Sequence, residues 1–156
     1  MNLRDYLDEH GVQYQLSHHP TTYTSQDLAE VAHVSGRRVI KPVVVDADGQ
    51  FVMCALPACC RIDLDELRNQ LHADKVRIVD EATLGRLFPD IELGAEPPIG
   101  RLFGIPTVMD DTLAADSSDD APVTFQAGTH EEAVTMSLGD YRRIAQPDIA
   151  HFGRHM

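Results

Sequence analysis

The sequence predicts a single α+β domain in which helices surround a mixed or antiparallel sheet. Two observations predict this class. Short β-branched runs are separated by turn residues, as in hairpins, and helical periodicities with capping residues lie between those runs. A chain of 156 residues has the length of one domain with a real core. We therefore expect residues 1–156 to form one unit, and the pattern leaves open whether its sheet closes into a barrel.

The most definite β element is a hairpin in the first third of the chain. The run Arg37–Val45 is rich in β-branched residues, and Phe51–Leu56 is a second apolar run. Between them, Asp46–Gln50 combines aspartates with a glycine, which favours a turn. We expect two strands joined by this turn.

Periodicity and capping residues predict the other elements. Helices are expected over Leu3–Glu9, from the Ser25 cap to about Ser35, over Leu64–Leu71 behind the Asp63 cap, and over Glu81–Phe88 and Leu138–Ala145. Strands are expected over Val12–Leu16, Val76–Val79, Thr107–Met109, Val123–Ala127 and Ala133–Met136. Ala114–Ala121 is expected to be a solvated acidic loop, and the tail Asp148–Met156 to be loosely held.

The charge of the chain limits its partners. Asp and Glu number 25 against 13 Lys and Arg, so the formal net charge is −12. Such a chain does not bind nucleic acid by bulk charge, which argues against a DNA-binding protein, and any RNA contact needs a local basic patch. No apolar run approaches the ~20 residues of a membrane helix and no secretory signal is visible, so we expect a cytoplasmic protein that does not enter membranes.

No metal or cofactor is expected from the motifs. The three cysteines, Cys54, Cys59 and Cys60, form no CxxC pair, which argues against a disulfide framework and a zinc site. The adjacent His18 and His19 point to opposite sides of an extended chain. The sequence contains no GxSxG elbow and no HExxH motif, so neither a serine nucleophile nor metal-bound water is indicated.

The segment from Gly94 to Asp110 organises the candidate site. Its three glycines and three prolines exclude a helix interior or a central strand. The prolines stiffen the loop, while Gly94 and Gly100 permit close backbone approach. Several N–H groups can then point at one anionic or carbonyl oxygen. An ordinary connecting loop is the alternative.

Lys41 is the unusual residue of the expected hairpin. It is one of two lysines in the chain and lies between Ile40 and Pro42 within an apolar run. One interpretation is a solvated residue on an edge strand, where Lys and Pro are both common. The other is a lysine directed into a pocket, where it holds a phosphate or carbonyl oxygen.

The chain contains a series of short motifs in a definite order between about Thr22 and Pro147. They are Lys41 within a strand, a GxxxP loop from Gly94 to Pro98, the following Ile99-Gly100, Asp110 after a short strand, and Ala127-Gly128-Thr129-His130 before a strand and the last helix. This series resembles the YbaK/EbsC family of aminoacyl-tRNA deacylases, which also occurs as an insertion in bacterial prolyl-tRNA synthetases.

The resemblance implies a mixed, mostly antiparallel, barrel-like sheet of six or seven strands surrounded by helices. It also implies a trans-editing hydrolase that acts on mischarged tRNA, with tRNAPro-type substrates expected. Such an enzyme cuts the ester between a wrong amino acid and the terminal ribose, assisted by the neighbouring ribose hydroxyl and water. The protein then has to hold and polarise the ester, with the amino acid selected by size.

The resemblance also assigns roles to residues. Lys41, Gly94 and Pro98 match the catalytic positions, and Lys41 would anchor the 3′-terminal phosphate or the carbonyl. Loop N–H groups between Ala95 and Ile99 are expected to stabilise the oxyanion. The residues expected to bind the substrate are Ala95, Ile99, Gly100, Asp110, Gly128, Thr129 and His130. Tyr23 and Phe103 are expected to form further walls of the pocket. Arg37, Arg38 and Arg101 are expected to form the local basic patch that contacts tRNA.

Two features depart from the family pattern. Pro42 follows Lys41 where many relatives carry a small or polar residue, which removes a backbone donor. The charge of −12 argues against tight independent tRNA binding, so a synthetase partner is an alternative source of affinity. A non-catalytic module that holds a small ligand, a tRNA 3′ end or a synthetase is the second hypothesis.

Overall fold

The structure is a computed structural model that describes residues 2–115 and 118–156. The helices in this part are α1 (Leu3–Glu9), α2 (Ser25–Val31), α3 (Leu64–Leu71), α4 (Glu81–Leu87), α5 (Thr112–Ala115) and α6 (Leu138–Ala145), with a 3₁₀ helix, η1, over Gly100–Phe103. The strands are β1 (Gln15–His18), β2 (Ile40–Ala47), β3 (Gln50–Pro57), β4 (Cys60–Ile62), β5 (Val76–Ile78), β6 (Thr107–Asp110), β7 (Pro122–Gln126), β8 (Glu132–Ser137), β9 (Asp148–Ala150) and β10 (Gly153–His155). Asp116 and Ser117 of the expected acidic loop lie outside the described residues.

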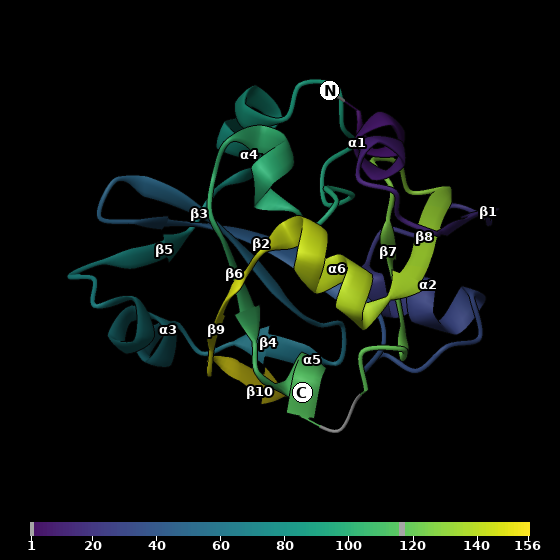
Figure 1. The fold of residues 1–156 in the computed structure, drawn as a ribbon. Coiled ribbons are helices and arrows are strands. Elements are labelled where there is room, and N and C mark those ends of the chain that lie inside the picture. Colours follow the sequence, from purple (N-terminus) through teal and green to yellow (C-terminus); the bar gives the residue numbers. More distant parts are fainter. Residues whose placement is uncertain (1, 116–117) are drawn as a thin grey trace.

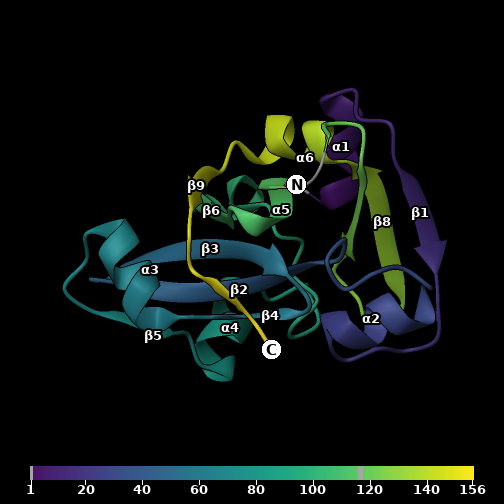
Figure 2. The same ribbon diagram turned by 90° about the horizontal axis from the view of Figure 1, so that it is seen from below.

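The described strands form two larger sheets and one separate pair. The first sheet has the order β5–β2–β3–β6–β9, the second has the order β1–β8–β7, and β4 pairs with β10. Only β3–β6 and β6–β9 among these pairs are parallel. Figures 1 and 2 show the two larger sheets side by side, with α3 beside the first and α2 beside the second. The α+β class and the mixed, mostly antiparallel strands are confirmed.

The barrel-like character comes from the junction between the two sheets. In the part of the chain that the structure describes, a parallel bridge between Val39 and Thr124 joins them, and they do not close into a complete barrel. The Thr124 N–H donates to the Arg38 carbonyl at 2.9 Å. This junction fixes the chain immediately before β2, where two of the candidate basic residues lie.

The register of β2 against β3 separates two apolar cores. Ile40 and Ala55 pack into one core together with Ile99. Lys41 lies opposite Leu56, which belongs to the second core. Because side chains alternate along a strand, Lys41 faces the side of the sheet opposite Ile40.

Local sequence explains most element boundaries. β2 and β3 extend further than expected, so the turn shortens to Asp48-Gly49, whose φ angles of 52° and 89° suit a two-residue hairpin. Thr24, rather than Ser25, caps α2 by accepting from the Asp27 N–H. Asp63 caps α3 as expected. No helix among the described residues is long and apolar enough to span a bilayer.

The expectation of a loosely held tail is wrong. β9 pairs in parallel with β6, and β10 pairs antiparallel with β4. Phe152 is fully buried in the second core, between these two strands in sequence. The tail is therefore an ordered part of the domain. Its strands have only three residues each, which is too short for a periodic signal in the sequence.

Candidate functional site

Lys41 lies half-buried at the start of β2. Its Nζ donates a hydrogen bond to the carbonyl of Cys60, the first residue of β4. Burial lowers the pKa of Lys41, because the ammonium loses part of its water shell. Lys41 is therefore not a freely solvated edge residue but a positioned cation.

A basic cavity of about 190 Å³ lies next to this lysine. Its lining includes the expected patch residues Arg37 and Arg38 together with Cys60, Thr112 and His155. No Asp or Glu occurs among the described residues that line it. Since Cys60 forms part of the wall and its carbonyl accepts from Lys41, the ammonium lies beside this basic cavity.

The loop Gly94–Gly100 is packed inside the protein rather than open. Residues 95–100 are all buried. The Tyr141 hydroxyl donates to the Pro98 carbonyl at 2.6 Å, and the Gly100 N–H donates to Thr107 Oγ1 at 2.7 Å. A Cβ on Gly100 would lie only 2.7 Å from that hydroxyl oxygen, so this position requires glycine for close packing.

The N–H groups of this loop are already engaged. Ala95 donates to the Glu92 carbonyl at 3.0 Å, and Ile99 donates to the Pro97 carbonyl at 2.7 Å. Gly94 donates to the Glu96 carboxylate at 3.2 Å. The expectation of bare amides is therefore corrected: a substrate oxygen would have to replace an acceptor that the loop itself supplies.

Glu96 is a candidate that the sequence analysis missed. Its side chain is buried, and it accepts from the Gly94 N–H and from its own N–H. Burial raises the pKa of this carboxyl, and nearby His130 acts in the opposite direction. Glu96 lies in a segment rich in glycine and proline, which has no helical or strand periodicity. In the sequence, only its place inside the GxxxP loop could have drawn attention to it.

The turn after β7 lies against the same loop. The Gly128 N–H donates to the Ala95 carbonyl at 2.9 Å, and His130 Nε2 contacts the Leu93 carbonyl at 2.6 Å. His130 is buried, and its Nδ1 has no hydrogen-bond partner among the described residues. The ring of Tyr23, which is largely exposed, lies 5.5 Å from that of His130. The structure thus brings three expected site residues, Gly128, His130 and Tyr23, beside one loop.

An apolar cavity of about 430 Å³ opens on this side of the molecule. Its lining includes Pro97, Phe103, Ala127, Gly128 and Thr129. The Phe103 ring packs edge-on against Phe88 at 4.5 Å. Cavities of this size and character accommodate small organic groups, so this apolar cavity is the candidate place for the amino acid.

Asp110 does not face a cavity. It is fully buried, and its carboxylate accepts from the N–H groups of Phe152 and Gly153 at 2.9 and 2.6 Å. Thr112 donates to it through both its N–H and its hydroxyl. These bonds hold the C-terminal segment, so Asp110 has a structural role here, and its substrate contact stays a prediction.

The expected site residues therefore fall into two groups. Arg37 and Arg38 line the basic cavity, beside which Lys41 binds the Cys60 carbonyl. The apolar cavity is lined by Phe103, by Gly128 and Thr129 of the turn, and by Pro97 of the loop. Ile99 packs in the core on the side of β2 opposite Lys41. The lysine does not face that end of the loop across a single pocket, and Arg101 is exposed on η1 without lining either cavity.

One side-chain cluster has donor atoms of the kind that bind metals. Oxygen and nitrogen atoms of Asp110, Asp111 and His151 lie within 4.8 Å of one another. The Asp110 oxygens already accept from backbone N–H groups, and His151 Nδ1 lies 3.0 Å from Asp111 in an ion pair. This pairing raises the pKa of His151. The cluster is explained by these internal bonds.

Comparison with known proteins gives a consistent result. Residues 19–144 match the family model described as an aminoacyl-tRNA editing domain. The multifunctional Ser/Thr-tRNA deacylase ProXp-y of Escherichia coli K12 is 24% identical over 152 residues, which are 95% of this chain and 89% of that protein.

Solved structures share the fold. The crystal structure of a hypothetical protein has a TM-score of 0.85 at 17% identity, covering 97% of this chain and 99% of that one. A protein provisionally described as a trans-editing enzyme for prolyl-tRNA synthetase has a TM-score of 0.83 at 16% identity, covering 97% and 94%. The family model spans most of the chain, including Lys41, the Gly94–Pro98 loop and His130. The chain therefore belongs to the aminoacyl-tRNA editing domain family, which confirms the resemblance and the class of enzyme, an aminoacyl-tRNA deacylase.

Proposed function

We propose that this protein is a trans-editing enzyme that removes a small, wrongly attached amino acid from tRNA. The observation that carries the proposal is the placement of the family lysine, Lys41, as a positioned cation beside a basic cavity within a family-matched chain. Water adds to the acyl carbon, the ester bond to the ribose oxygen breaks, and a proton of that water ends on the ribose oxygen. The products are a free amino acid and uncharged tRNA.

Within this proposal, the two groups of residues have different tasks. Lys41 anchors the 3′-terminal phosphate, because its ammonium binds the carbonyl of Cys60, which lines the basic cavity together with Arg37 and Arg38. Gly128 and Thr129, which line the apolar cavity, hold the acyl group there, supported by Gly94, Pro98 and His130 of the adjoining loop and turn. Substrate binding displaces the acceptors that now occupy the loop N–H groups, which then face the oxyanion.

A panel of charged tRNAs tests the function. tRNAPro charged with Ala, Cys or Ser is the first set, and Ser- and Thr-charged tRNAs are the second, because a relative is a Ser/Thr-tRNA deacylase. Loss of the ester well above the rate without protein is expected for at least one pair. No loss with any pair would refute the proposal.

A specific observation favours a second candidate. The loop N–H groups of Gly94, Ala95 and Ile99 all have intramolecular acceptors, so no preformed oxyanion site is present in that loop. A binding module that holds a tRNA 3′ end without hydrolysis would need none. Measurable binding of tRNA together with an unchanged ester would identify this alternative.

A further inference from the structure

We propose that the C-terminal strand β10 completes a phosphate-binding site for the acceptor end of tRNA, with His155 as a ligand beside Arg37 and Arg38. This inference deepens the proposed function and rests on it for the identity of the RNA. The family model ends at residue 144, so β9 and β10 lie outside the matched region. The contribution of β10 is thus not described by the family model.

The first argument is the firm attachment of the tail. Asp110, which is fully buried, accepts from the N–H groups of Phe152 and Gly153, and the Met156 N–H donates to the Cys59 carbonyl at 3.0 Å. A Cβ on Gly153 would lie 2.7 Å from a carboxylate oxygen of Asp110. Figure 1 shows β4, β10 and α5 gathered at one end of the molecule, next to the C-terminus. The backbone of β10 is therefore held in a fixed place.

The second argument is the register. His155 lies opposite Cys60 in the β10–β4 pair, and the Cys60 carbonyl accepts from Lys41 Nζ. His155 also lines the basic cavity with Arg37 and Arg38. The tail thus adds an imidazole to the cavity that Arg37 and Arg38 line, next to the residue whose carbonyl binds Lys41.

The third argument is charge. The chain carries a net charge of −12, yet the described lining of the basic cavity contains two arginines, a histidine and the Thr112 hydroxyl without a carboxylate. Neither Arg37 nor Arg38 forms an ion pair within residues 2–115 and 118–156. Guanidinium groups without carboxylate partners in a concave place suit a phosphate, which accepts several hydrogen bonds. Phosphate contacts of this kind supply RNA affinity without reading sequence.

The neighbouring Arg154 provides a matched control. It lies on the same strand but pairs with Asp63 at 2.5 Å and lines a different hollow. Removing Arg154 deletes a full positive charge one residue away from His155. Bulk electrostatics therefore predicts a larger loss from Arg154→Ala, whereas a built site predicts a larger loss from His155→Ala.

The experiment measures binding of an uncharged acceptor-stem RNA ending in CCA, and separately of inorganic phosphate. We expect His155→Ala to weaken RNA binding roughly threefold or more, and Arg37→Ala/Arg38→Ala to weaken it more than tenfold. The double arginine variant should also lower the slope of log K against log salt by about 2. Arg154→Ala and the equally charged control Arg68→Ala/Arg77→Ala should change affinity less than twofold.

The outcomes separate this inference from the proposed function. RNA binding through His155 without ester loss on any charged tRNA leaves the site intact and refutes the enzyme. Ester loss with an unchanged KM in the His155 and Arg37/Arg38 variants refutes the site and leaves the enzyme. Equal losses of RNA affinity from His155→Ala and Arg154→Ala would also refute the site. If the protein binds inorganic phosphate but not the RNA, the assignment of the site to tRNA is refuted. Folding of each variant is checked by its circular dichroism and thermal midpoint.

Discussion

The two cavities differ in the origin and chemistry of their walls. The apolar cavity is lined mainly by residues of the family-matched region, among them Pro97, Phe103 and Gly128, and also by Asn2 and Leu3, which precede that region. The basic cavity takes one wall from β10, beyond that region, and its lining includes two arginines and a histidine. On the proposed function, residues mainly of the family-matched region would hold the amino acid, while the contact with the nucleic acid backbone would depend in part on the tail.

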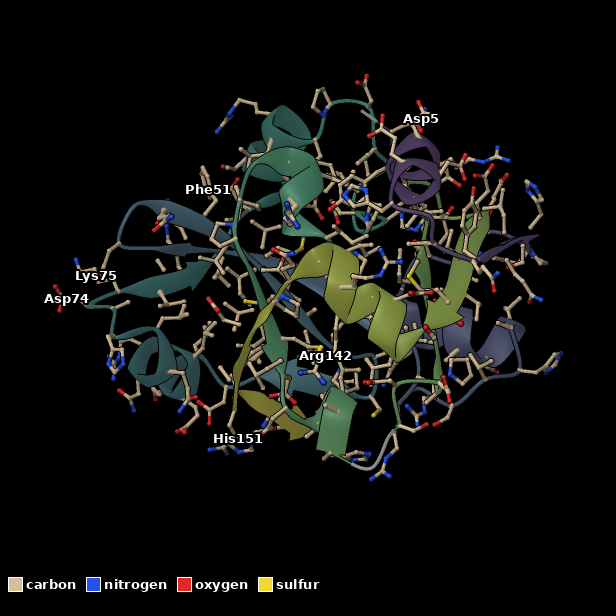
Figure 3. All side chains as sticks on the ribbon, in the orientation of Figure 1. Asp5, Phe51, Asp74, Lys75, Arg142 and His151 are labelled. Atoms are coloured by element: carbon tan, nitrogen blue, oxygen red, sulfur yellow. The ribbon has the colours of Figure 1, made fainter. Side chains whose placement is uncertain are left out.

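The largest expected effect on activity comes from replacing Lys41. Lys41→Ala should lower kcat/KM for deacylation about 10- to 100-fold, because a charge-assisted hydrogen bond to the anchored phosphate contributes ~1.5–3 kcal/mol. Lys75→Ala is the matched control, since Lys75 is the other lysine and lies exposed at the far tip of the β5 region (Figure 3). Single-turnover ester loss measures both. Near-wild-type activity of Lys41→Ala in a folded protein would contradict the role.

The next effect concerns the tail. Gly153→Ala places a Cβ against the Asp110 carboxylate, so β10 has to shift. We expect a loss of about 2 kcal/mol in the free energy of unfolding in urea and weaker RNA binding, with amino-acid selectivity unchanged. Gly85→Ala is the control, because a Cβ there meets nothing within 4 Å. Equal stability of Gly153→Ala and wild type would show that the tail is not held as described.

The apolar cavity is expected to set selectivity. Phe103→Ala enlarges it, so the preference among charged tRNAs should shift toward larger amino acids by about tenfold. Phe51→Ala removes a phenyl group from the same core, but Phe51 does not line the cavity. The comparison uses relative kcat/KM over the panel. If the order of kcat/KM values among the charged tRNAs is unchanged in Phe103→Ala, the amino acid does not bind in this cavity.

Much of the fold was predictable because the signals were local. Asp63 as a cap, the apolar spacing of Leu138–Ala145 and the β-branched run of β2 each act within a few residues. The tail was mispredicted because β9 and β10 are three residues each, and what holds them is a distant carboxylate, Asp110. A contact between residues so far apart leaves no periodic trace in the sequence.

The candidate site was predictable in its members but not in its arrangement. The grouping of Gly94, Gly128 and His130 follows from the motifs, and the structure brings them together. The side of β2 that Lys41 faces depends on strand register, because a shift of one residue reverses every side chain. The engaged loop amides depend on Glu96, whose role is visible only when the loop is folded.

The smallest expected effect is at Glu96, and it tests whether the loop is strained by a buried charge. Burial raises the pKa of this carboxyl in the folded protein, so the folded state binds a proton more readily than the unfolded chain. The ionised form therefore destabilises the fold above the folded pKa, and this cost disappears as the pH falls below the pKa of the unfolded chain.

Glu96→Gln keeps the oxygen that accepts from the Gly94 N–H and removes the charge. We expect it to raise the free energy of unfolding by on the order of 1 kcal/mol at pH 7 and by progressively less toward pH 4, as measured by urea denaturation across that range. Glu131→Gln, an exposed carboxylate near the same turn, should show no such trend. If Glu96→Gln is less stable than wild type at pH 7, this expectation is contradicted. The negative charge of Glu96, and not only its oxygen as an acceptor, would then hold the loop in place until an ester oxygen replaces the carboxylate.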